Sequence, residues 1–142
     1  MHNKLLLILL LTSMFSLPSL SCDENGTTGI VEDNQLWIGP EVKSPTTITK
    51  EEFDAILDRV DRIYRPIIKS KGGRLKVNRK WEDGTVNAYA RQSGSVWEIS
   101  MFGGLARHET ITADAFALVA CHEIGHHIGG APKKTGWFGN SW

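Results

Sequence analysis

The hydrophobic residues between positions 53 and 68 recur with the spacing of an α-helix. They stand at positions 53, 56, 57, 60, 63, 64, 67 and 68, which form one stripe on a helix surface. Thr49 precedes this stripe and Glu52 follows three residues later, the pattern of a capping box. Pro66 is expected to kink or end the helix, and KGG (71–73) to close it. One amphipathic helix is therefore predicted to begin at this capping box.

The period of the hydrophobic positions then changes to two. Three runs alternate in this way, and they are residues 74–81, 85–91 and 95–102. The sequences EDG and QSG that separate them are typical of turns. Because tight turns join neighbouring antiparallel strands, we expect a three-stranded antiparallel meander.

A last helix is predicted from about residue 112 to residue 128. The stretch AFALVAC (115–121) makes it hydrophobic nearly all round, which is typical of a buried central helix. Gly129 and Gly130 follow its end. A helix, a meander and a buried helix together predict a small α+β domain over residues 49–142.

The composition fits one small domain. The chain has 142 residues, of which 41% are hydrophobic, enough for one modest core and too little for two. Sixteen Lys and Arg residues balance sixteen Asp and Glu residues. The charge balance therefore gives no indication of binding to nucleic acid or to an anionic membrane surface.

Residues 1–21 have the pattern of a signal peptide. Lys4 precedes the apolar run LLLILLL (5–11), and small residues stand at positions 19 and 21. The apolar run is too short to span a bilayer comfortably, and a buried N-terminal helix is the alternative. Residues 22–48 are polar and rich in Gly, Thr and Pro, and we interpret them as an extended lead-in. The protein is therefore expected to be secreted or periplasmic.

Cys22 stands at the expected cleavage point, where the mature protein would begin. A lipid attached to this cysteine would anchor the protein to the cell envelope. Ser19, however, occupies the position where lipoprotein signals usually carry Leu. Free export and lipid anchoring stay open as equal alternatives.

The segment HEIGH (122–126) provides the candidate chemistry. His122 and His126 are one helical turn apart, so both imidazoles can reach one tetrahedral zinc ion. Glu123 lies about 100° round the helix from His122, where it can touch a zinc-bound water without being a ligand. Zinc lowers the pKa of such a water, and the carboxylate takes its proton as it attacks a carbonyl. The alternative is that the two histidines only pack in a buried helix, which would leave polar groups without partners.

Two longer stretches resemble the prenyl-protease/HtpX-like gluzincins, a family of zinc metallopeptidases. VNAYARQSGSVWEISMFGGL (86–105) is similar to the strands that lead to their active helix, and TADAFALVACHEIGHH (112–127) is similar to that helix. The resemblance covers roughly residues 49–130. It implies a zincin-like N-terminal subdomain and zinc-dependent hydrolysis of peptide bonds.

The same resemblance implies a place for the substrate. In these enzymes the strand that carries Asn-Ala borders the cleft and pairs with the substrate backbone. Asn87, Ala88 and Tyr89 would then bind substrate, because an exposed strand edge can bind an extended peptide through main-chain hydrogen bonds.

The sequence departs from the family at the third zinc ligand, which gluzincins take from a Glu on a later helix. No acidic residue follows His126. Two explanations stay open: the chain is a fragment that ends before this ligand, or an upstream carboxylate such as Glu109 replaces it.

Two functions follow from these patterns. The first is a secreted or periplasmic zinc endopeptidase that acts on peptides or proteins and whose zinc site is incomplete in the sequence as given. The alternative is a non-catalytic zinc-binding or structural domain of an envelope lipoprotein. The presence of Glu123 favours the first, since metal binding alone does not require it, whereas the missing third ligand favours the second.

Overall fold

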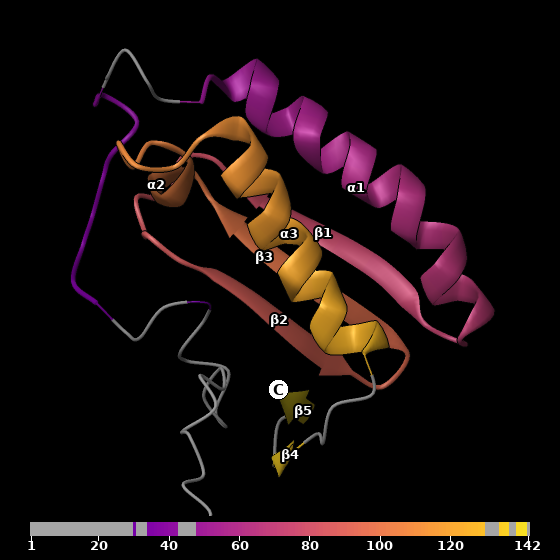
Figure 1. Ribbon diagram of the computed structural model, residues 1–142. Helices are drawn as coiled ribbons and strands as arrows, with labels where there is room; N and C mark the ends of the chain where they lie inside the picture. The colour runs from indigo at the N-terminus through magenta and orange to yellow at the C-terminus, as the bar shows by residue number, and fades with distance from the viewer. Residues whose placement is uncertain (1–29, 31–33, 43–47, 130–133, 137–138, 142) are drawn as a thin grey trace, which may run out of the picture.

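Figure 1 shows the computed structural model, which describes residues 30, 34–42, 48–129, 134–136 and 139–141. The predicted signal peptide and Cys22 lie outside the described residues, as does much of the predicted lead-in. No helix within the described part of the chain is long and apolar enough to cross a membrane.

Helix α1 spans Lys50–Ser70 and begins with the predicted capping box. The Thr49 hydroxyl accepts a hydrogen bond from the Glu52 amide at 3.2 Å, and the Glu52 carboxylate accepts one from the Thr49 amide at 2.9 Å. Pro66 lies inside the helix and does not end it. Ile68, beyond the proline, is fully buried. Its packing holds the last turn although proline cannot donate a helical hydrogen bond.

Three strands form the main part of the sheet: β1 (Arg74–Lys80), β2 (Ala88–Ser93) and β3 (Val96–Phe102). Strand β3 lies between the other two, parallel to β1 and antiparallel to β2. The expected antiparallel meander is therefore wrong, because a meander would place β2 in the middle. Only the β2–β3 hairpin forms as expected, with Gly94 at a φ of 56° in its turn.

The connection between β1 and β2 explains this strand order. Residues 81–87 form this connection and do not make a tight hairpin turn. Two hydrogen bonds hold them against the residues that follow β3. The Gly104 amide donates to the Asp83 carbonyl at 2.9 Å, and the Arg107 guanidinium donates to the Trp81 carbonyl at 2.9 Å. Strand β2 consequently begins on the far side of β3.

Two short strands, β4 (Lys134–Gly136) and β5 (Gly139–Ser141), complete the sheet. They pair with each other in antiparallel fashion, and β5 pairs with β2 where Asn140 lies opposite Gln92. The order of the sheet is β1-β3-β2-β5-β4. Strand β2 is thus the last long strand on one side of the described sheet.

Helices α2 (Gly103–Ala106) and α3 (Ala113–Ile128) follow the sheet strands. Helix α3 lies over β2 and β3, beside α1 (Figure 1). At its start the Thr112 hydroxyl accepts a hydrogen bond from the Ala115 amide at 3.2 Å. These contacts place α3 at the centre of the described fold.

Helix α3 is buried on one face only. Phe116, Ala120 and Ile124 are fully buried against the core, whereas Leu118 is 71% exposed. The expectation of a helix buried nearly all round is therefore wrong, because the sheet and α1 cover only part of its circumference. The coarse class, a mixed α+β domain, agrees with the sequence-based expectation.

Candidate metal centre

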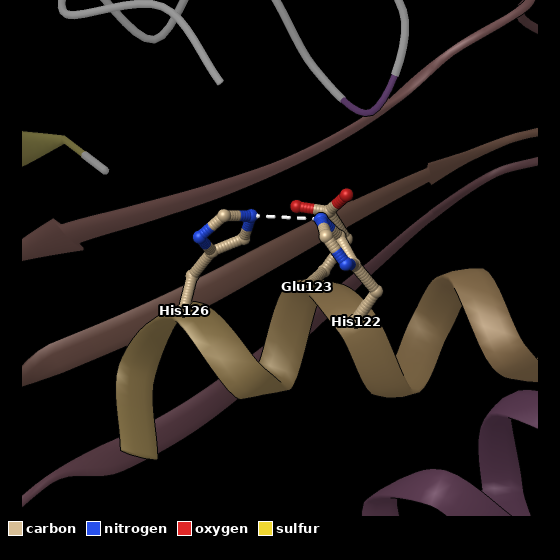
Figure 2. A group of neighbouring side chains, drawn as sticks. All are labelled: His122, Glu123 and His126. Carbon is tan, nitrogen blue, oxygen red and sulfur yellow. Dashed lines mark hydrogen bonds between the residues drawn. The ribbon is translucent and has the colours of Figure 1, made fainter. Parts of the chain in front are cut away.

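The three residues of the predicted motif come together in the second half of α3. His122 and His126 project from the same side of the helix, and their Nε2 atoms are 3.0 Å apart (Figure 2). Two nitrogen ligands of a tetrahedral ion lie about 3.3 Å apart when each bond to the metal is about 2.0–2.1 Å long. The pair therefore needs to open by only a few tenths of an ångström to hold one ion.

Glu123 completes this cluster from the buried side. Its side chain is fully buried, and neither carboxylate oxygen has a hydrogen-bond partner among the described residues. A carboxylate oxygen of Glu123 and a ring nitrogen of each histidine all lie within 4.8 Å of one another. A buried carboxylate without a partner is costly, and a cation at this place would offset that cost. The residues present therefore fit a metal ion.

The electrostatics of the cluster depend on burial. Burial raises the pKa of Glu123 from 4.5 to about 8, so the metal-free protein holds a proton on this carboxyl group at neutral pH. Burial, and to a smaller extent the charge of His122, lowers the pKa of His126. A neutral imidazole is the form that binds metal ions, so this shift favours ligation.

The cluster has no third protein ligand besides Glu123 in the described residues. No other Cys, His, Asp or Glu side chain of this part joins it. Glu109, the upstream carboxylate considered from the sequence, lies in the loop before α3 and does not belong to the cluster. Cys121 is a free thiol that also lies outside it.

His127 faces the sheet and takes no part in the cluster. The ring is 3% exposed, stacks on Trp97 with the ring centres 5.7 Å apart, and places Nε2 2.9 Å from the Glu98 carbonyl oxygen. These contacts fasten the last turn of α3 to β3. His127 lies about 100° round the helix from His126, which predicts that it is not a ligand, but the sequence gives no sign of its partners.

The predicted substrate residues lie at the start of β2. Asn87 is 2% exposed, and its side-chain oxygen accepts a hydrogen bond from the Ala88 amide at 2.9 Å. Ala88 is fully buried, and the Tyr89 ring meets the Phe102 ring edge-on at 5.4 Å. The side chains of Asn87 and Ala88 thus point into the protein, and their role in substrate binding stays a prediction.

The sequence analysis does not predict the role of Arg107, whose guanidinium joins the lead-in to the connection between β1 and β2. Its side chain is 3% exposed and donates hydrogen bonds to the carbonyl oxygens of Ile38 and Trp81 at 3.0 and 2.9 Å. It also lies over the Trp81 ring. No local motif marks an arginine that binds backbone carbonyls from distant segments.

Comparison of the chain with models of protein families, with curated protein sequences and with solved structures finds no match.

Proposed function

We propose that this protein is an exported zinc-dependent peptidase with its active site at His122, Glu123 and His126. The observation that carries the proposal is the cluster itself. Two imidazole nitrogens lie 3.0 Å apart. Both lie within 4.8 Å of a buried carboxylate that has no hydrogen-bond partner in the described part of the protein. Packing alone gives no reason to place a carboxyl group there.

The two histidines and Glu123 have different tasks in this proposal. The Nε2 atoms of His122 and His126 would hold zinc, which when bound would lower the pKa of a water and polarise a carbonyl group. The Glu123 carboxylate orients the attacking water and takes its proton, and it later gives a proton to the leaving amine. The burial of Glu123 keeps bulk water from competing for this carboxylate.

Strand β2 is the proposed binding place for the substrate backbone. It is antiparallel to β3 and lies beside α3 (Figure 1). An extended peptide could add to its outer edge through main-chain hydrogen bonds, beside the three site residues. Peptides or unfolded protein segments are therefore the proposed substrates, and export follows from the signal-like residues 1–21.

Replacement of Glu123 by alanine tests the proposal. The variant should still bind zinc, because both imidazoles remain, but should lose peptide hydrolysis by a factor of about 10² or more. His122→Ala and His126→Ala should lose both zinc and activity. Zinc content by atomic absorption and hydrolysis of a quenched fluorescent peptide library measure the two properties. Near-normal turnover by Glu123→Ala would show that the proposed mechanism is wrong.

One observation favours a second function, a non-catalytic zinc-binding or structural domain. The described residues supply two histidines and one carboxylate but no further ligand. If Glu123 is itself the third ligand, the site binds metal without a base. Glu123→Ala would then lose zinc, which distinguishes this function from the peptidase.

A further inference from the structure

The lead-in returns to the sheet and lies along the outer edge of the chain that enters β2. The Ile30 amide donates to the Ala88 carbonyl at 3.3 Å, and the Ile38 amide donates to the Gly84 carbonyl at 2.8 Å. Trp37 and Thr85 form an antiparallel bridge between these two contacts. We call residue 30 and residues 34–38 the strap. The strap lies antiparallel to residues 84–88 and pairs with them as a strand at Trp37 and Thr85.

The strap occupies the backbone groups that an added peptide needs. In an extended chain the carbonyl groups of alternate residues point to the same edge. Gly84, Val86 and Ala88 therefore present their carbonyl oxygens together. The strap reaches all three, because the Asn34 side-chain amide donates to the Val86 carbonyl at 3.3 Å.

The same edge is also covered farther along β2. Gln92, four residues beyond Ala88 and hence on the same edge, pairs with Asn140 of β5. Within the described residues, only Ala90 on this edge lies between the strap and β5. Figure 2 shows strands passing behind the three site residues, with an indigo stretch of chain at upper right and an olive strand at left.

The strap is attached at both ends and exposed between them. At its C-terminal end the buried Arg107 guanidinium donates to the Ile38 carbonyl at 3.0 Å, and Gly39 is buried. At the other end Ile30 is partly buried against the hydrophobic core, and between the two ends Leu36 is 55% exposed and Trp37 is 65% exposed. Release of the strap from residues 84–88 thus has to expose Ile30 and break two hydrogen bonds, while the Arg107 contact keeps Ile38 attached.

We propose that the strap is an autoinhibitory segment, which occupies the outer edge of residues 84–88 in place of an extended peptide and must leave before a peptide binds there. The inference rests on the proposed function, because it assigns this edge to the substrate. An open fraction of about one tenth would weaken the apparent peptide affinity about tenfold. Release of the strap would restore that affinity.

The strap sequence itself is the probe for this proposal. A fluorescein-labelled peptide IVEDNQLWI (residues 30–38) is titrated against the full chain and against a loosened variant, Ile30→Pro with Asn34→Ala. Proline at position 30 removes the backbone N–H that donates to the Ala88 carbonyl. Alanine at position 34 removes the side-chain amide that donates to the Val86 carbonyl. Leu36→Ala is the control, because it shortens an exposed strap side chain. All proteins carry Glu123→Ala, so that no peptide is cleaved.

The loosened variant should bind the peptide about tenfold tighter than the full chain or the Leu36→Ala control. The Ala90 amide should shift on binding in a nitrogen–proton NMR spectrum. Equal affinity of the three proteins, with unchanged thermal unfolding, would overturn the proposal. If the loosened variant does not fold, Asn34→Ala alone is titrated with the same peptide: tighter binding than by the Leu36→Ala control supports the strap, and equal affinity overturns it.

The two proposals can fail separately. If the affinity rises in the loosened variant but no protein with an intact Glu123 hydrolyses peptides, the strap stands and the peptidase function fails. If hydrolysis occurs but the loosened variant shows neither tighter binding nor faster hydrolysis, the peptidase function stands and the strap proposal fails.

Discussion

Glu123 is the residue at which the stability of the fold and the proposed chemistry oppose each other. Its carboxyl group is fully buried without a partner among the described residues, which costs folding free energy when the group is ionised. The proposed mechanism needs the ionised form. A cation held by His122 and His126 would reconcile the two, because a positive charge lowers the pKa of a neighbouring carboxyl group.

This opposition gives the metal-free protein a specific pH dependence. The pKa of Glu123 is about 8 in the folded protein against 4.5 for an unperturbed glutamate. Between these values the folded state keeps a proton that the unfolded chain releases, so the free energy of unfolding falls as pH rises. The expected loss is about 1.4 kcal/mol per pH unit.

Urea denaturation of the chelator-treated protein at pH 6.5 and 7.5 measures this loss. The lowered pKa of His126 affects stability mainly below pH 6.5, so this window isolates Glu123. Glu123→Gln cannot ionise and should show little change across the window, with a higher stability than the natural chain at pH 7.5. An equal slope in both proteins would contradict the buried, protonated carboxyl group.

At this scale the site is largely readable from the sequence. The spacing of His122 and His126 fixes one face of any helix, and the structure brings their ring nitrogens together. The contacts of His127 and Arg107 could not be predicted, because their partners come from strands and loops far away in the chain. Helix periodicity says where a side chain points but not what it meets.

At the scale of the elements, local patterns predict the helices better than the sheet. The capping box at Thr49 and the β2–β3 hairpin at Gly94 form as expected, since each depends on residues close in sequence. The position of β1 beside β3 depends on how residues 81–87 pack against α2. No alternation of hydrophobic residues encodes that contact.

Gly104 shows how closely α2 approaches the β1–β2 connection. A methyl group at this position would overlap the backbone carbonyl oxygens of Gly84 and Thr85. Gly104→Ala should therefore lower the free energy of unfolding by about 1–3 kcal/mol, and loosen the start of β2. Gly125→Ala is the matched control, since its methyl group would meet no heavy atom of the described residues.

Gly125 lies inside α3, where alanine is the better helix former by about 1 kcal/mol. The control should therefore be neutral or stabilising. Thermal unfolding followed by circular dichroism measures both variants. Equal stability of Gly104→Ala and the natural chain would show that α2 and the connection are not packed as described.

At the scale of the whole molecule, the candidate site lies between elements that come from both ends of the chain. The strap reaches the edge of β2 from the N-terminal side, and β5 reaches it from the C-terminal side. The described fold therefore surrounds the edge beside the three site residues with two of its own segments. Access to that edge, and not only the chemistry of α3, would set the activity.

The number of protein ligands at the candidate metal site also depends on the whole molecule. If His122 and His126 were the only protein ligands, they would fill two of the four positions of a tetrahedral zinc ion. We expect the purified 142-residue chain to carry less than one zinc per molecule and to release it to a chelator such as EDTA. Inductively coupled plasma mass spectrometry before and after dialysis measures this. One zinc per chain that survives the chelator would contradict the expectation. The ligand would then be sought among the acidic residues outside the described part, which are Asp23, Glu24, Glu32 and Asp33.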